Sequence, residues 1–107
     1  MFERRSDTGY RLALDGIERK TLVHGNKTLM TEFRLRQGAV LPRHAHPHEQ
    51  IGYLVKGRIR LSIGAEEYVA QAGDSWCILG GVEHGADILE DSTAVEVFSP
   101  VREDYLG

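Results

Sequence analysis

Residues 38–57 read GAVLPRHAHPHEQIGYLVKG. Three histidines and one glutamine fall within seven positions of this stretch, namely His44, His46, His48 and Gln50. Neutral imidazole is the side chain that borderline divalent metal ions prefer. Side chains two residues apart on an extended chain point to the same face. We therefore expect His44 and His46 to hold one ion from one strand.

The other histidines differ in their settings. Pro47 interrupts regular strand pairing, so we expect His48 to lie beside the site or in solvent. His24 stands next to a predicted turn and is expected to be exposed. His84 alone shares a turn-and-strand setting with the first cluster, which makes it the candidate for a further ligand.

The spacing of this stretch resembles the first motif of the cupin superfamily. That motif is a glycine, five residues, His-x-His, three or four residues, a glutamate, six residues and a glycine. In this chain the fixed positions are Gly38, His44, His46, Gln50 and Gly57. Gln50 stands where the family most often has glutamate.

A second stretch resembles the other cupin motif, in which a glycine, a proline, a glycine, a histidine and an asparagine recur at set intervals. The matching positions here are Gly73, Leu79, Gly81, His84 and Ile88. Leu79 replaces the proline and Ile88 replaces the asparagine. Two motifs with their glycines in register are a more specific signal than His-x-His alone.

The resemblance implies an all-β fold, the cupin jelly-roll β-barrel or double-stranded β-helix. It also implies that His44, His46, Gln50 and His84 bind a divalent transition metal, which the sequence leaves open as Ni, Zn, Fe, Mn or Cu. All four ligands are neutral, so the bound ion would keep its full positive charge. The competing interpretation is a set of polar residues in the barrel mouth that holds no ion.

Periodicity points independently to an all-β chain. The segment LMTEFRL, residues 29–35, alternates apolar and polar side chains, and RIRLSIG at 58–64 does the same. Many short strands separated by turn signals are typical of a sandwich or barrel. We expect one domain over residues 1–107, with an N-terminal arm at 1–16 that contains one short strand and a polar tail at 100–107.

Composition favours an ordinary globular chain. The net charge of −3 gives no electrostatic footprint for nucleic acid, and no apolar run approaches the length of a membrane span. Cys77, the only cysteine, cannot form an internal disulfide, which favours a cytoplasmic location, as does the lack of an apolar leader. Because it lies in the apolar run WCIL, we expect Cys77 to be a small buried core residue.

The segment VEVFSPVRED, residues 95–104, adds a finer resemblance, to the small cupins of the pectin-degradation KdgF type. Those proteins ketonise 4,5-unsaturated uronic acids released by polysaccharide lyases, opening the sugar ring to a linear acid. The resemblance implies catalytic roles for Glu96, Phe98 and Arg102. Glu96 stands where that family has aspartate, and Val101 replaces a proline.

Three hypotheses of function follow. The first is a metal-dependent enzyme that ketonises unsaturated uronates, small sugar acids from pectin or alginate breakdown. The second is a dioxygenase, since a three-histidine ferrous site can bind O₂ as well as substrate. The third is a sugar-binding module without catalysis. Because small cupins commonly pair through edge strands and termini, we also expect a homodimer.

Overall fold

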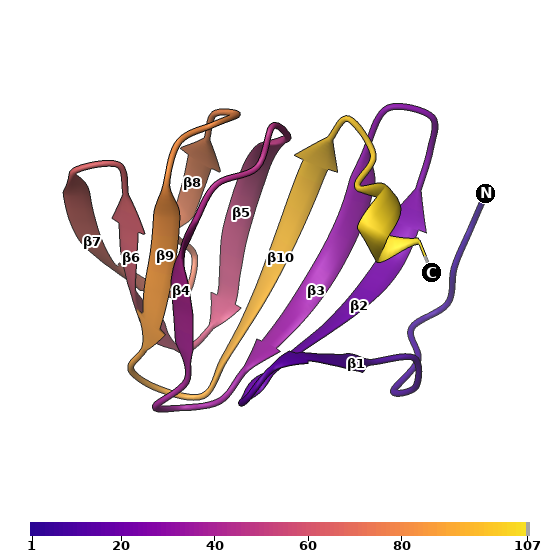
Figure 1. The fold of residues 1–107 in the computed structure, drawn as a ribbon. Helices are drawn as coiled ribbons and strands as arrows, with labels where there is room; N and C mark the ends of the chain where they lie inside the picture. Colours follow the sequence, from indigo (N-terminus) through magenta and orange to yellow (C-terminus); the bar gives the residue numbers. More distant parts are fainter. Residues whose placement is uncertain (107) are drawn as a thin grey trace.

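The computed structural model describes residues 1–106, which consist mainly of β-strands and loops (Figure 1). Within these residues there are ten strands and one short 3-10 helix, η1, and no α-helix. The elements are β1 Arg11–Leu14, β2 Ile17–His24, β3 Leu29–Leu35, β4 Val40–His44, β5 Glu49–Lys56, β6 Arg58–Ile63, β7 Glu66–Gln71, β8 Ser75–Ile78, β9 His84–Ile88, β10 Ser92–Ser99 and η1 Glu103–Tyr105. No helix of the described chain is long and apolar enough to cross a membrane.

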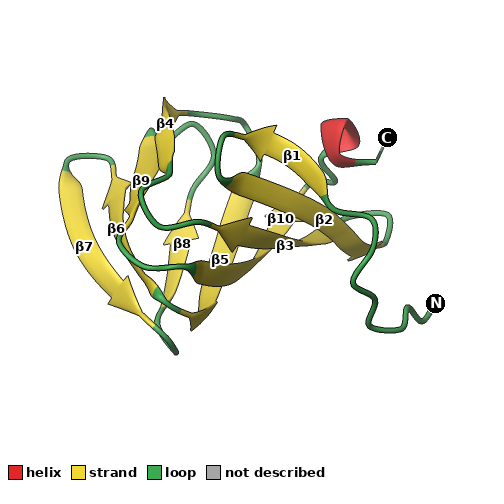
Figure 2. Ribbon diagram, turned by 90° about the horizontal axis from the view of Figure 1, so that it is seen from below, coloured by secondary structure: helices red, strands yellow, loops and turns green. Residues whose placement is uncertain are grey.

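The strands form two antiparallel sheets that pack against each other (Figure 2). The larger sheet has the order β1-β2-β3-β10-β5-β8, and the smaller has the order β4-β9-β6-β7. Strands that are distant in sequence are neighbours, as where β10 pairs with both β3 and β5. The all-β jelly-roll prediction is confirmed, and β1 is the short strand expected in the N-terminal arm.

Strand alternation decides which side chains enter the space between the sheets. On β5 the buried residues are Gln50, Gly52 and Leu54, and the residues between them are exposed. This is the period of two that a half-buried strand requires. It directs Gln50 inward and leaves Glu49 on the outer face, as predicted.

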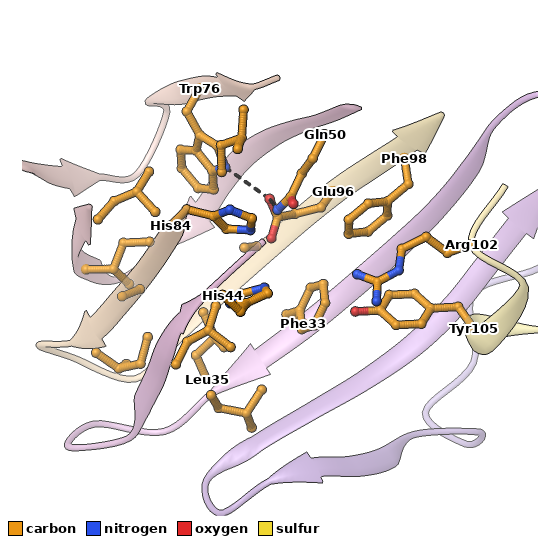
Figure 3. A pocket seen from close by; sticks show the side chains of 18 residues that line it. Phe33, Leu35, His44, Gln50, Trp76, His84, Glu96, Phe98, Arg102 and Tyr105 are labelled. Carbon is orange, nitrogen blue, oxygen red and sulfur yellow. Dashed lines mark hydrogen bonds between the residues drawn. The ribbon is translucent and has the colours of Figure 1, made fainter. Parts of the chain in front are cut away.

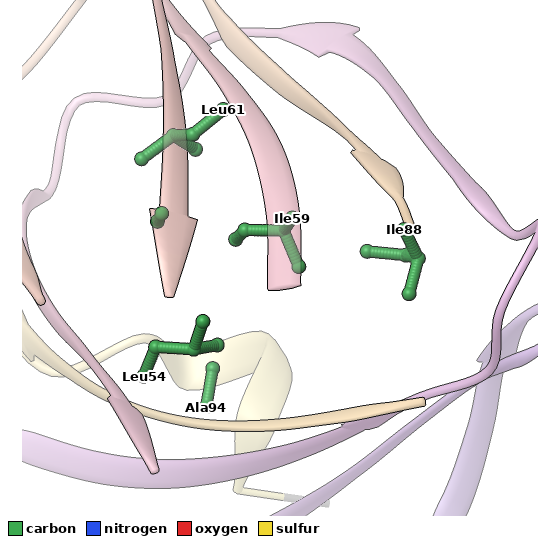
Figure 4. Packing of buried hydrophobic residues seen from close by; sticks show 6 residues of the cluster. Leu54, Ile59, Leu61, Ile88 and Ala94 are labelled. Carbon is green, nitrogen blue, oxygen red and sulfur yellow. The ribbon is translucent and has the colours of Figure 1, made fainter. Parts of the chain in front are cut away.

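One end of the space between the sheets is filled by an apolar core (Figure 4). The core residues come from both sheets and are Leu54, Ile59, Leu61, Ala70, Ile88 and Ala94. Gly57 closes the connection between β5 and β6 with a φ of +96°, which favours glycine. A Cβ there would also lie 2.0 Å from the Ser92 hydroxyl oxygen, so the last glycine of the first motif is required for space as well.

The expectation that Cys77 is buried is wrong. Cys77 is exposed, and its neighbours Trp76 and Ile78 point the other way, into the molecule. It pairs with Ile51 of β5, which is itself on the outer face. The apolar run of four residues therefore gave a wrong prediction. A strand with one face in solvent still exposes every second residue.

The C-terminal tail packs more closely than its polar sequence suggests. Tyr105 of η1 lies against β2 and β3, where the Thr21 hydroxyl donates to the Tyr105 carbonyl oxygen at 2.6 Å. Its ring meets that of Phe33 edge-on, with 6.3 Å between centroids. The tail therefore packs against the larger sheet, with η1 beside β2 and β3 (Figure 1).

Candidate metal centre and substrate cavity

Three histidines converge, two from strands of the smaller sheet and one from the loop that follows β4. His44 ends β4 and pairs directly with His84, which begins β9. The ring centroids of His44 and His84 are 4.3 Å apart, and those of His46 and His84 are 4.9 Å apart. One nitrogen from each ring lies within 4.8 Å of the other two, so this group could hold a metal ion.

The geometry differs from the predicted one in a single respect. We expected His44 and His46 to act from one strand, but β4 ends at His44 and His46 lies in the loop that follows. Pro47 continues that loop, and β5 resumes at Glu49. The loop thus turns the His46 ring back toward its two partners.

Each of the three imidazoles is oriented by its own backbone. The Nδ1 atom contacts a carbonyl oxygen two residues away, and because a carbonyl only accepts, Nδ1 must carry the hydrogen. Each Nε2 then presents a lone pair, which is the form that binds a metal ion. For His44, His46 and His84 in turn, the acceptors are Pro42, His48 and Val82 at 2.9, 3.0 and 2.9 Å.

The donor atoms at the centre fit a cation. Gln50 Oε1 lies 2.9 Å from His46 Nε2, while the Gln50 amide nitrogen donates to Glu96 at 2.5 Å. With Nδ1 protonated, a lone pair on His46 therefore faces a lone pair on Gln50, an arrangement that a shared cation would stabilise. Among the described residues, His84 Nε2 is buried without a hydrogen-bond partner. These observations fit the divalent metal that the motif implies.

Burial and nearby positive charge favour the neutral, metal-binding form of two of the imidazoles. Burial lowers the pKa of His46, and the positive charge of Arg102 lowers it further. The pKa of His84 is also lowered, mainly by burial. Neutral rings at ordinary pH are what metal binding needs.

His48 takes a supporting position. Its carbonyl oxygen accepts the hydrogen bond from His46, and its ring packs against the His46 ring with 5.6 Å between centroids. His24 is exposed at the far end of β2. His48 therefore lies beside the histidine group and His24 is exposed, as expected for their positions in the sequence.

Glu96 lies next to the histidine group, on the inner face of β10. Its Oε1 accepts hydrogen bonds from the Gln50 amide at 2.5 Å and from the Trp76 indole at 3.0 Å (Figure 3). Burial raises the pKa of Glu96, and the hydrogen bonds from Gln50 and Trp76, together with the charge of Arg102, act in the opposite direction. An acid in this setting is suited to proton transfer.

Arg102 and Phe98 form the neighbouring wall. The Arg102 guanidinium stacks 4.1 Å above the Tyr105 ring and 5.0 Å from the Phe98 ring, and its side chain is only 15% exposed. Asp104 accepts hydrogen bonds from Nε and Nη2 of Arg102 at 3.2 and 2.7 Å. Figure 3 shows the guanidinium directed into the cavity beside Phe98.

Most of the site residues predicted from the sequence therefore surround a single cavity. Six of these residues line the cavity, namely His44, Gln50, His84, Glu96, Phe98 and Arg102. The His46 ring contacts the ring of Phe98, with 5.7 Å between centroids. Sequence analysis missed Trp76 and Tyr105, which also line the cavity. In the sequence Trp76 belongs to the apolar run WCIL and Tyr105 to the polar tail, and no spacing signal marks either residue.

Comparison with known proteins identifies the family. The family model described as a cupin domain matches residues 31–100. This chain is a cupin. It is 32% identical over 94 residues to the pectin degradation protein KdgF of Dickeya dadantii, with 86% of each chain covered.

Solved structures agree with this assignment. The structure of KdgF from a Halomonas species is similar to this cupin with a TM-score of 0.93 and 31% identity, covering 99% of this chain and all of that one. A cupin described as RmlC-like from Shewanella frigidimarina has a TM-score of 0.89 and 29% identity, covering 94% of this chain and 90% of its own. The similarity to KdgF proteins, which the sequence suggests from the first histidine stretch and the tail, thus extends over the whole fold.

The two departures from the second cupin motif lie outside the cavity's polar end. Leu79 is exposed beside the loop of Gly80 and Gly81, and Ile88 is buried in the apolar core. The motif histidine, His84, is unaffected by either change. The altered positions therefore lie outside the group of donor atoms.

Proposed function

We propose that this cupin is a metal-dependent enzyme that opens and ketonises 4,5-unsaturated uronates derived from pectin or alginate. Its similarity to proteins named KdgF, one of them described as a pectin degradation protein, supports a role in this chemistry. The observation that carries the proposal is the meeting of an acid, Glu96, with a cation, Arg102, beside a group that can hold a metal.

In this proposal His44, His46, His84 and Gln50 hold the divalent ion. When bound, the ion supplies Lewis acidity, which polarises a substrate oxygen. Because all four ligands are neutral, the ion would keep its full positive charge, which would strengthen this polarisation. Nitrogen and amide-oxygen ligands suit Ni, Zn, Fe, Mn or Cu better than Mg or Ca.

Arg102 is suited to hold the substrate carboxylate. Asp104 occupies the Nε and Nη2 edge of the guanidinium, so Nη1 is left to donate to a uronate. Phe98, fully buried at the cavity wall, offers an apolar surface to one face of the sugar ring. These two contacts would place the ring within reach of Glu96.

Ring opening and ketonisation need only the movement of a proton. The hydroxyl on C1 loses its proton, the bond from C1 to the ring oxygen breaks, and C1 becomes a carbonyl. The ring oxygen then belongs to an enolate on C5, and a proton added at C4 converts C5 to a ketone. Glu96 accepts the first proton as a carboxylate and returns one to C4, so atoms and charge balance without a redox partner.

The test combines metal analysis with an assay of the conjugated C4=C5 bond, whose ultraviolet absorbance disappears on ketonisation. We expect Glu96→Gln to keep its metal and to lose about 100-fold or more in turnover, because a positioned acid or base contributes that much. Glu49→Gln, on the exposed face of β5, is the matched control and should behave as the parent. Equal turnover in Glu96→Gln and the parent would contradict the role of Glu96.

The same protein preparation separates the alternatives. A dioxygenase would consume O₂ with a redox-active metal, whereas ketonisation consumes none. A binding module would retain a sugar acid and leave its double bond intact. The homodimer stays a prediction, which light scattering would check.

A further inference from the structure

Three residues form a row across the larger sheet. Glu96 of β10 is the direct partner of Gly52 on β5, and Gly52 is in turn the partner of Trp76 on β8. Glu96 and Trp76 both line the cavity. Because Gly52 has no side chain, residues two strands apart can meet above it.

The contact across Gly52 is specific. The Trp76 indole nitrogen donates to Glu96 Oε1 at 3.0 Å. A Cβ on Gly52 would lie 2.1 Å from two atoms of the indole, so any larger residue there must displace the ring. Gly52 does not have a positive φ, so its requirement is for space and not for a special backbone conformation.

We propose that Trp76 is a positioning residue for Glu96, and that Gly52 provides the space for their contact. This inference rests on the proposed function. The Gln50 and Trp76 hydrogen bonds both end on Oε1, and no hydrogen bond among residues 1–106 ends on Oε2. Two donors on one oxygen hold the carboxylate in place and leave Oε2 for the substrate proton. The indole suits this role because it can only donate.

The length of Glu96 matches this arrangement. Aspartate at this position would be shorter by one methylene, about 1.5 Å. Added to the present 3.0 Å, that change would take the indole contact beyond hydrogen-bond range. Trp76 and Glu96 therefore act as a matched pair, and Glu96→Asp should break the contact while it keeps an acid at the site.

The contact itself can be tested without turnover. Trp76 is the only tryptophan of the chain, so its indole N–H gives a single resonance in a proton–nitrogen correlation spectrum of the labelled protein. We expect Glu96→Asp to move this resonance upfield, because a hydrogen bond to a carboxylate is lost. The outer-face variant Glu49→Asp should leave it in place. An unmoved resonance in Glu96→Asp overturns the contact.

Steady-state kinetics test whether the contact between Trp76 and Glu96 contributes to turnover. Trp76→Phe keeps an aromatic ring and removes the N–H, and we expect kcat to fall about tenfold or more with KM changed less than about twofold. In a Glu96→Asp background the same substitution should have no further effect on kcat, since the contact is already absent. Losses that multiply in the double variant would show that Trp76 acts independently of Glu96 and would overturn the inference.

Gly52→Ala provides a second route to the same result. It should lower kcat like Trp76→Phe, whereas Gly25→Ala should have no effect, because nothing lies within 4 Å of a Cβ at Gly25. Unchanged kcat in Gly52→Ala contradicts the inference. Absence of uronate turnover in the parent protein overturns the proposed function and the positioning role with it, while the indole resonance still decides the contact.

Discussion

The two ends of the space between the sheets are built by the same strands but differ in chemistry. Toward one end the inward residues are apolar, and toward the other they are polar (Figures 3 and 4). Each of three strands contributes one inward residue to the apolar end and one to the polar end. These residues are Leu54 and Gln50 on β5, Ile88 and His84 on β9, and Ala94 and Glu96 on β10. The period of two that directs a side chain inward is therefore shared, and residue type alone distinguishes core from site.

This contrast separates stability from activity. The apolar end removes hydrocarbon from water, which stabilises the fold. The polar end buries atoms such as His84 Nε2 that lack a protein partner among residues 1–106, which is unfavourable until a ligand or ion satisfies them. Substitutions at the two ends should accordingly change different measured quantities.

The largest effect is expected at the metal centre. His84→Ala removes one of three converging imidazoles, and we expect loss of bound metal and a fall in turnover of about 1,000-fold. Metal analysis and the uronate assay measure both. His24→Ala, at an exposed histidine, is the control. Full metal occupancy and turnover in His84→Ala would break the distinction between the two ends.

A smaller effect, on stability, is expected at the apolar end. Leu54 is completely buried, so Leu54→Ala should lower the free energy of unfolding by about 2–5 kcal/mol. Urea titration measures this change, and the folded variant should still bind metal. Val55→Ala, at the exposed neighbouring position, should change stability by no more than about 0.5 kcal/mol. Equal losses in the two variants would contradict the assignment of the core.

The smallest effect concerns the cavity wall. Arg102→Lys keeps the charge but loses the planar guanidinium that Asp104 holds and the Nη1 donor directed to the carboxylate, so we expect KM for the uronate to rise about tenfold with little change in kcat. Steady-state kinetics of the uronate assay give both constants. Arg60→Lys, on a half-exposed side chain of β6, should leave them unchanged. A lower kcat with constant KM would instead assign Arg102 to the chemical step.

The sequence by itself determined the fold class and the inward residues of the strands. Alternation in β3 and β6 and glycines such as Gly57 are local features, and local sterics decide them wherever the strand packs. The motif spacing also selected the histidines that converge. The exposed Cys77 shows where prediction from the sequence fails, because a short apolar run does not reveal which of its residues face solvent.

Tertiary structure alone decided how the cavity is completed. His46 reaches its partners through a loop that turns back, and Tyr105 enters the wall because η1 packs on β2 and β3. Trp76 meets Glu96 only because β8 and β10 flank β5 at Gly52. Strand order and register are properties of long-range pairing, so contacts that cross strands distant in sequence cannot be read from local pattern.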